Sequence, residues 1–403
     1  MPLFVEGEER IFVKAKTESR KSARAGKDSD YEGLFDKRIV TESNRERLPN
    51  FVKGILERRN INARPAYQRR PRWTDKQKSR LIESFLMNLP VPPIFLYENA
   101  ANSYEIVDGQ QRVTALLDFY NNKLVLKGIK SSPLLNRKTY ATLPPKVRDE
   151  IDRRSIAYIT LMTESAKTDE EAFAIKREVF ERLNTGGVKL SAQEIRNCLA
   201  ESEFNEMVKR LARLPAFTSA WGIPPRSNND DNVASKEFKQ LQKNKIYSTM
   251  QDVELVLRFF VFRHSDQINA GDGAGGLKRL IDKYMIAASK FGPTQLAALE
   301  RLFTDTIDVA QEIFAGQLFR AWRRQTWDKR RYKELYDAVM VGISRNLEHK
   351  DTLIQRRKAI ITETQALLEA DKAGIYIGKG KTKAQIKERI DGFDDLLKKV
   401  LAG

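Results

Sequence analysis

The chain has 403 residues, of which 41% are apolar and 31% charged, a composition typical of a globular protein long enough for two domains with separate cores. Its formal net charge of +18 predicts attraction to polyanions such as nucleic acids and nucleotides, without implying any sequence preference. A single cysteine excludes an internal disulfide and a cysteine-rich zinc site, and two histidines leave almost no material for a histidine metal cluster or an HNH nuclease centre.

Residues 1 to about 45 mix charged side chains with Ser, Gly and Asp, and they predict a basic arm that is partly disordered. This arm could contact DNA or only keep the protein soluble. The N-terminus lacks the apolar core of a signal peptide, and no apolar run approaches the roughly 18 to 20 residues that span a bilayer. We therefore expect a cytoplasmic protein without membrane contact.

A compact domain is expected over residues 46–200. Its first clear helix should begin after Thr74, because Thr74 and Gln77 have capping-box spacing, and it should stop at Pro90. A short strand is then expected over Ile94–Tyr97.

The most informative stretch consists of Asp108, Gly109, Gln110, Gln111 and Arg112. Residues 104–107 before it predict the end of a strand, and residues 113–120 after it repeat apolar side chains at helix spacing. The polar stretch should therefore lie at a helix N-terminus, where unpaired N–H groups and the positive end of the helix dipole favour an anion.

Each residue of this turn has a role that such a site could use. Arg112 could bind a phosphate through two N–H groups, and Gly109 would let a ligand approach the backbone. Asp108 could hold Mg²⁺, a water molecule or a ribose hydroxyl, and the two glutamines could orient a water or read a base edge. The alternative is conformational: Asp108 would cap the helix and Arg112 would pair with a surface carboxylate. The spacing alone favours neither interpretation.

The rest of this domain shows a hairpin-like segment near Leu124–Ile129, a loop over residues 131–145 and an apolar strand at Ser155–Met162. A helix is expected from about residue 170 to 183, followed by a glycine turn. Another helix should begin at Ser191, because Ser191 and Glu194 have capping-box spacing.

Residues 201–403 show a mostly helical pattern and predict a second, helical domain. Val253–Phe262 predicts a buried helix on which Glu254 and Arg258 have ion-pair spacing. The segment Gln317–Tyr336 interleaves basic and aromatic residues and predicts a basic helix, either a nucleic-acid surface or a solvated face. The candidate DNA-binding residues are Arg320, Arg323, Arg324, Arg330 and Arg331.

A possible P-loop ending at residues 378–382 is not assigned, because Ile375 occupies the place of its first glycine and no long strand precedes it.

Three blocks occur in order along the chain: Tyr67-Gln68-Arg69 with Trp73, then Val107-Asp108-Gly109-Gln110-Gln111-Arg112, then Phe180 to Gly187 followed by Leu190 to Asn197. Together they resemble the N-terminal domain of GmrSD-type, modification-dependent restriction systems, a ParB/sulfiredoxin-like family. The resemblance covers about residues 50–200 and continues weakly through residues 252–260. It implies an α+β fold, with a ParB-like mixed N-terminal domain followed by a mainly α-helical C-terminal region.

The resemblance also implies that the Asp-Gly-Gln-Gln-Arg turn binds, and in some members hydrolyses, a nucleoside triphosphate, and so controls DNA cleavage in defence against phage. By position, the implied catalytic residues are Asp108, Gln110, Gln111 and Arg112, with Asp108 as the Mg²⁺ ligand. The implied contacts of the nucleotide, GTP or ATP, are Tyr67, Arg69, Gly109, Arg112, Thr114, Asn184, Thr185 and Gly186. Arg196 lies beyond this group, about one turn into the helix expected to begin at Ser191. Arg69 could equally stack on Trp73 and organise a loop.

The chain departs from many relatives because neither His264 nor His349 lies in an HNH-type context. A separate subunit could supply the nuclease activity, or the Asp108 turn could itself attack phosphodiester bonds. Alternatively, the protein could act only as a sensor. We therefore expect an NTP-hydrolysing, DNA-associated subunit of an antiviral restriction system, which could also form a homo-oligomer. The alternatives are a DNA-binding module without catalysis and a ParB-like nickase.

Overall fold

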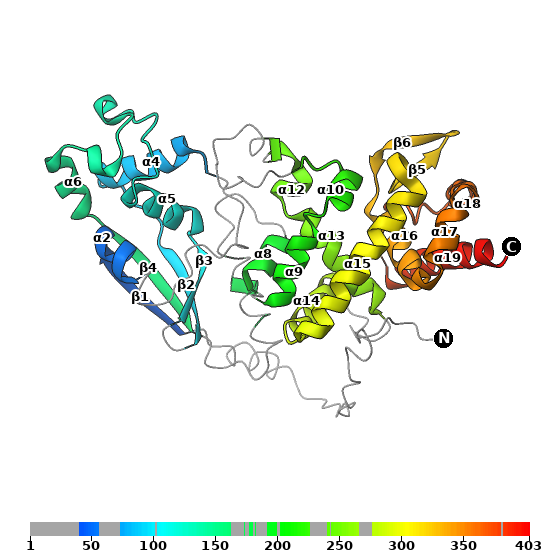
Figure 1. The fold of residues 1–403 in the computed structure, drawn as a ribbon. Helices are drawn as coiled ribbons and strands as arrows, with labels where there is room; N and C mark the ends of the chain where they lie inside the picture. Colours follow the sequence, from blue (N-terminus) through cyan, green and yellow to red (C-terminus); the bar gives the residue numbers. More distant parts are fainter. Residues whose placement is uncertain are drawn as a thin grey trace, which may run out of the picture. The chain divides into compact units, whose positions relative to one another are not determined.

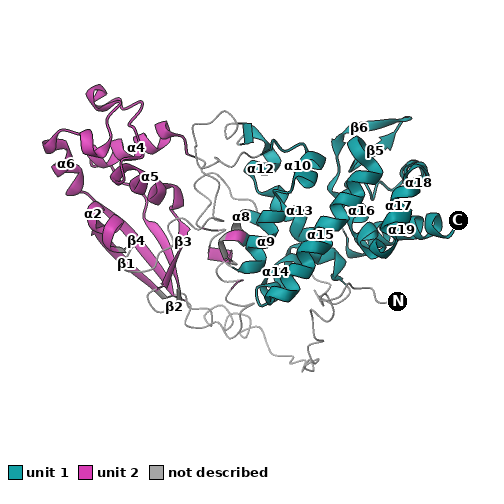
Figure 2. Cartoon of the chain, viewed as in Figure 1, with its two compact units in different colours: residues 1–18, 191–196, 200–403 teal, residues 19–190, 197–199 magenta. Residues whose placement is uncertain are grey.

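The computed structural model (Figure 1) describes residues 40–55, 73–100, 103–162, 173, 177–179, 182, 192–199, 202–225, 240–241, 243–265, 276–379 and 382–403. The chain divides into two compact units (Figure 2). The sheet unit takes residues 19–190 and 197–199, and the helical unit takes residues 1–18, 191–196 and 200–403.

The sheet unit contains β1 Val40–Arg47, α2 Leu48–Asn50, the π-helical turn η1 Phe51–Ile55, α4 Asp75–Leu86, β2 Ile94–Ala100, β3 Ser103–Asp108, α5 Gln110–Tyr120, the short turns η2 Pro133–Leu135 and η3 Tyr140–Thr142, α6 Pro145–Asp152 and β4 Ser155–Met162. The four strands form one sheet in the order β1-β4-β2-β3. β2 runs parallel to β4, while the pairs β1–β4 and β2–β3 are antiparallel. This mixed architecture confirms the expected α+β class.

The core of the sheet unit joins α4 and α5 to the strands. Its buried members include Leu81, Ile82 and Phe85 of α4, Val113, Leu116 and Phe119 of α5, and Ile94, Leu96 and Ile106 of the sheet. One ion pair also ties the two helices together, since Lys78 Nζ lies 2.7 Å from Asp118 Oδ2 and both side chains are nearly buried. Removing either partner of such a buried pair is strongly destabilising, because the other charge stays buried without compensation.

The start of α4 confirms the predicted capping box: the Thr74 side chain accepts from the Gln77 N–H, and Gln77 returns a bond to the Thr74 backbone. The helix ends at Leu86, earlier than the predicted stop at Pro90. Asn88 has a φ of 56°, a left-handed conformation that cannot continue a helix.

Two segments differ from expectation. β1 begins at Val40, within the segment assigned to the basic arm, and its polar sequence is held by pairing along β4. The segment Leu124–Ile129 is not a strand hairpin, although Leu124, Leu126 and Ile129 are buried. Its backbone bonds instead run to a neighbouring loop, with Leu126 N donating to Lys138 O at 2.9 Å. Alternate residues of this segment are buried, as in a strand, but the segment does not pair with a strand of the sheet.

The helical unit contains most of α8 Ala192–Leu199, then α9 Glu203–Leu211, α10 Pro215–Trp221, α12 Lys245–Ser248, α13 Gln251–Arg263, α14 Gly276–Ala288, α15 Pro293–Phe314, η6 Ala315–Gln317, β5 Arg320–Arg323, β6 Thr326–Arg331, α16 Lys333–Arg345, η7 Leu347–His349, α17 Lys350–Gln355, α18 Arg357–Ala370 and α19 Lys383–Ala402. The predicted buried helix is confirmed as α13. None of the described helices is long and apolar enough to cross a membrane.

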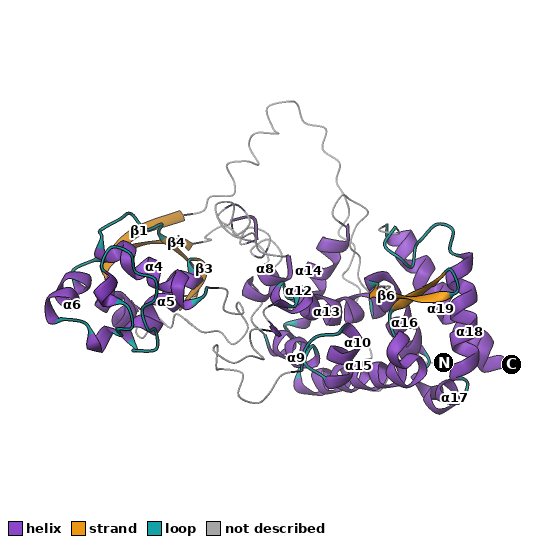
Figure 3. Ribbon diagram, turned by 90° about the horizontal axis from the view of Figure 1, so that it is seen from above, coloured by secondary structure: helices purple, strands orange, loops and turns teal. Residues whose placement is uncertain are grey.

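The basic helix predicted over Gln317–Tyr336 is wrong, because this segment forms the antiparallel hairpin β5–β6 (Figure 3). Its two-residue turn consists of Arg324 and Gln325, with φ angles of 48° and 60°. Such turns match the twist of paired strands, but they usually carry Asn or Gly, so the sequence lacked the ordinary hairpin signal.

A buried ion cluster joins three helices of this unit. Asp337 of α16 is fully buried and accepts from Arg258 Nε of α13 at 3.1 Å and from Arg389 Nη2 of α19 at 2.7 Å. Arg258 Nη2 also donates to the same carboxylate. Two charge-assisted partners compensate the desolvation of one buried carboxylate.

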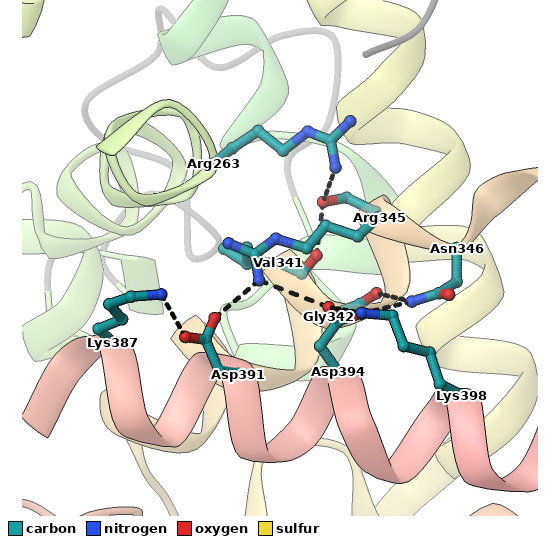
Figure 4. A network of polar contacts seen from close by, with 10 residues as sticks. Arg263, Val341, Gly342, Arg345, Asn346, Lys387, Asp391, Asp394 and Lys398 are labelled. Carbon is teal, nitrogen blue, oxygen red and sulfur yellow. Dashed lines mark hydrogen bonds and ion pairs between the residues drawn. The ribbon is translucent and has the colours of Figure 1, made fainter. Parts of the chain in front are cut away.

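The crossing of α16 and α19 is close at Gly342, where a Cβ would lie 2.8 Å from the Phe393 ring. Beside this contact, Arg345 Nη1 lies 3.0 Å from Asp391 Oδ1 and 3.6 Å from Asp394 Oδ2 (Figure 4). Polar contacts therefore fix the register of two helices whose backbones approach through a glycine.

Candidate functional site

The predicted strand-to-helix turn is confirmed. β3 ends at Asp108, Gly109 takes a left-handed conformation with φ 100° and ψ 7°, and α5 begins at Gln110. Val113 N donates to Gly109 O at 2.9 Å, the first bond of the helix. No side chain caps this N-terminus within the described residues. The backbone N–H groups of Gln111 and Arg112, in the first turn of α5, have no hydrogen-bond partner among the described residues and can donate to an acceptor from outside the helix.

Gly109 is required for two separate reasons. Its φ lies where side chains other than glycine are strained. A Cβ at this position would also lie 3.0 Å from Ile94 Cγ1 and 3.1 Å from Arg112 Nη2. The glycine therefore makes room for a protein guanidinium, whereas the sequence suggested room for a ligand.

Asp108 and Arg112 converge. Arg112 Nη2 lies 2.6 Å from Asp108 Oδ2 and also donates to the Pro93 carbonyl at 3.0 Å. The side chains of Arg112 and Asp108 are 15% and 23% exposed, so the pair is partly withdrawn from water and screened less than a surface pair. The turn thus holds a fixed charge pair at the start of α5.

The conformational alternative explains only part of this arrangement. The N-cap position belongs to Gly109, so Asp108 does not cap α5. Arg112 does pair with a carboxylate, but with the one in its own motif. Arg112 Nη1 and Asp108 Oδ1 have no hydrogen-bond partner among the described residues, while Arg112 Nε is buried beside Gly109. One donor group and one acceptor atom of the pair therefore remain for a ligand.

The two glutamines of the turn make hydrogen bonds within the protein. Gln111 Oε1 accepts from the Trp73 backbone N–H at 3.2 Å and so ties the entry of α4 to the turn. Gln110 is buried, and its carbonyl accepts from the Thr114 hydroxyl at 2.9 Å. Gln111 can still offer its amide N–H groups to a water or a ligand.

Several predicted nucleotide contacts lie outside the described residues: Tyr67, Arg69, Asn184, Thr185 and Gly186. Arg196 is described and is buried in the helical unit, where its Nε lies 2.7 Å from Asp282 Oδ1 of α14. This ion pair gives Arg196 a structural role.

The donor set for a metal at the turn is small. No group of three His, Cys, Asp or Glu side chains that could hold a metal ion occurs in the described part of the chain. Mg²⁺ commonly uses one or two carboxylates together with water and substrate phosphates, so the free Asp108 Oδ1 fits a shared site of that kind. His264 is buried, and its Nδ1 lies 2.9 Å from the Tyr284 hydroxyl.

Two residues of the site were not predicted from the sequence. Pro93 accepts a hydrogen bond from Arg112, and Ile94 lies where a Cβ on Gly109 would contact it. The antiparallel register pairs Phe95 with Asp108, which places the start of β2 beside the turn. The Pro92-Pro93 pair before the predicted strand was the available signal, but the pairing of β2 with β3 could not be deduced from it.

The predicted DNA-binding arginines all lie on the hairpin. Arg323, Arg324 and Arg330 are exposed, whereas Arg320 and Arg331 are half-buried. Arg323 and Arg330 lie over the Tyr332 ring at 5.7 and 5.0 Å. These arginines form one basic element of the helical unit.

The tryptophans of the hairpin are engaged in packing. Trp322 and Trp327 pack edge to face at 5.4 Å, and Trp322 Nε1 donates to Glu369 Oε1 of α18 at 2.8 Å. The pair therefore anchors the hairpin to α18 and is not a free stacking platform.

Comparison with protein families identifies the N-terminal part of the chain. Residues 52–201 match a family model described as GmrSD restriction endonuclease, N-terminal domain. The matched range includes the Asp108 turn, while the hairpin lies outside it. No significant match was found among curated proteins or among solved structures.

Proposed function

Because residues 52–201 form a domain of the GmrSD N-terminal family, we propose that this chain is a nucleotide-binding, NTP-hydrolysing component of a DNA restriction system. The Asp108 turn would bind the triphosphate of GTP or ATP, and the bound nucleotide would control DNA cleavage. The observation that carries the proposal is the Asp108–Arg112 ion pair at the uncapped N-terminus of α5.

The charges of the turn suit a phosphate group and a cation together. The backbone N–H groups of Gln111 and Arg112, together with Arg112 Nη1, would donate to phosphate oxygens, since they offer donors and positive charge. A phosphate close to Asp108 would be repelled unless a cation lies between them. Mg²⁺ held by Asp108 Oδ1 would supply that cation and neutralise charge on the phosphates during transfer.

The protein's own part in hydrolysis would be positioning. Arg112 is already held by Asp108 and Pro93, so its donor group needs little reorganisation when a phosphate arrives. The Gln111 amide, fixed through its Oε1 to Trp73, would orient the attacking water.

The test is phosphate release from GTP and ATP by the purified full chain with Mg²⁺. We expect Arg112→Ala to lose nucleotide binding, measured with a fluorescent analogue, and Asp108→Asn to lose Mg²⁺-dependent turnover. A matched control is the exposed pair Lys127–Asp75 of the same unit, whose atoms lie 2.9 Å apart. Lys127→Ala and Asp75→Asn should retain both activities.

Equal turnover by wild type and by the Asp108 and Arg112 variants would refute the proposed site. Supercoiled plasmid should be incubated with the same proteins. Metal-dependent nicking that disappears in Asp108→Asn, without any NTP turnover, would favour the nickase alternative. No nicking, together with NTP turnover, would require a separate nuclease.

A further inference from the structure

Two arginines of the hairpin lie directly opposite each other. The strand register pairs Arg320 of β5 with Arg331 of β6. Like charges at facing positions destabilise a pair of strands, unless an opposite charge compensates them. No described carboxylate lies within ion-pair distance of either guanidinium.

Both arginines are also partly withdrawn from water. The Nε atoms of Arg320 and Arg331 are buried and have no hydrogen-bond partner in the part of the chain that the structure describes. The Arg331 guanidinium packs on Gly222 at the end of α10, where a Cβ would lie 3.0 Å from its Nη1. Burial and, after it, the charge of Arg320 lower the pKa of Arg331.

Three other buried arginines of the helical unit are paired with carboxylates. Arg258 and Arg389 share Asp337, and Arg196 has Asp282. Each of these three guanidiniums therefore has an opposite charge within the fold, which Arg320 and Arg331 lack among the described residues. An uncompensated, half-buried pair is what remains when the counter-charge comes from a ligand.

The turn of the same hairpin carries a second irregularity. Arg324 and Gln325 both adopt left-handed φ angles of 48° and 60°, which cost energy for residues other than glycine. Residues held in such conformations cluster at functional sites. The exposed cations around the turn, Arg323, Arg324, Lys329 and Arg330, extend the positive surface away from the facing pair.

We propose that Arg320 and Arg331 together bind a phosphodiester group of DNA, with the exposed cations of the hairpin contacting neighbouring phosphates. A two-stranded ribbon that carries several cations matches a polymer of phosphates better than a single small anion. The site lies in the helical unit and does not depend on nucleotide binding at Arg112.

The test uses the full chain and a short fluorescein-labelled DNA duplex, with affinity measured by anisotropy over a range of salt concentrations. We expect Arg320→Gln and Arg331→Gln each to weaken binding by about tenfold or more and to reduce the salt slope by about one. Arg320→Lys keeps the charge and should recover part of the affinity. Arg301→Gln, which removes an exposed charge from α15, should bind like wild type.

A stability measurement separates this role from packing. Without DNA, Arg320→Gln should raise the melting temperature, because it removes a facing like charge, whereas loss of a packing arginine would lower it. DNA should stabilise the wild type more than the variant.

Three results would overturn the proposal. One is wild-type DNA affinity in both glutamine variants, and another is an equal loss in Arg301→Gln, which would indicate unspecific charge. The third is stabilisation by inorganic phosphate or pyrophosphate without DNA binding, which would assign the pair to a free phosphate compound.

Discussion

Gly109→Ala is the substitution that most directly tests the geometry of the turn. Alanine at a φ of 100° is strained, and its Cβ would lie 3.0 Å from Ile94 Cγ1 and 3.1 Å from Arg112 Nη2. The methyl group would therefore displace the guanidinium from Asp108. We expect a loss of stability together with a loss of the ion pair.

The magnitude follows from two contributions. A left-handed alanine costs about 1–2 kcal/mol, and overpacking at a buried site costs about 1–3 kcal/mol more. Gly128→Ala is the matched control, because Gly128 also has a positive φ of 72° but is exposed and faces only methylene groups of the flexible Lys76 side chain. It should show the first contribution alone, leaving a difference of about 2 kcal/mol, or about 4–8 °C in melting temperature.

The assay is hydrogen exchange of the α5 amides in increasing urea, read by mass spectrometry, because it reports on the sheet unit separately from the helical unit. Gly109→Ala should open α5 at a lower urea concentration than Gly128→Ala and should bind nucleotide more weakly. If the two variants open together, Arg112 does not pack on Gly109 and the described geometry is refuted.

Three further predictions concern the helical unit. Gly342→Ala should lower stability by about 1–3 kcal/mol in thermal unfolding, because its methyl group would lie 2.8 Å from the Phe393 ring; an unchanged melting temperature would contradict the close helix crossing. The double substitution Arg324→Asn with Gln325→Gly should raise stability by about 1–2 kcal/mol by relieving the turn, and a decrease would show that the turn is not strained. Burial raises the pKa of Asp252 to about 7 in spite of its arginine partner. This pKa exceeds the value of about 4 in the unfolded chain, so the protonated carboxyl group stabilises the fold fully below about pH 4. The stabilisation is lost as the pH rises through about 7. Relative to Asp252→Asn, the wild-type melting temperature should therefore fall between these pH values, and a difference that is independent of pH would refute the shift.

The sequence was sufficient where the determining contacts are local. The strand, glycine and helix around residue 109 follow from apolar spacing and from one residue that tolerates a positive φ. The cap at Thr74 is equally local. The hydrogen bond from Arg112 to Pro93 was beyond reach, because it depends on the pairing of two strands. Local chemistry was thus predictable, whereas the partners of each side chain were not.

The sequence also failed to predict strands that are stabilised mainly by pairing with a neighbouring strand. β1 has a polar sequence and exists through its antiparallel register with β4. The hairpin β5–β6 carries Arg324-Gln325 at its turn instead of Asn-Gly, so its basic and aromatic residues were interpreted as a helix. In both segments tertiary pairing outweighs intrinsic preference.

The carboxylate of Asp337 has a consequence for attempts to dissect this protein. Its two guanidinium partners come from helices separated by more than a hundred positions, Arg258 near the middle of the chain and Arg389 close to its end. Deleting the final helix would remove Arg389, leaving Arg258 as the remaining partner of this buried carboxylate among the described residues, and would expose Gly342 and Phe314, which Phe393 contacts. Fragments that stop before residue 383 should therefore be insoluble or form a molten globule. Expression trials should keep α19 intact and add affinity tags after Gly403.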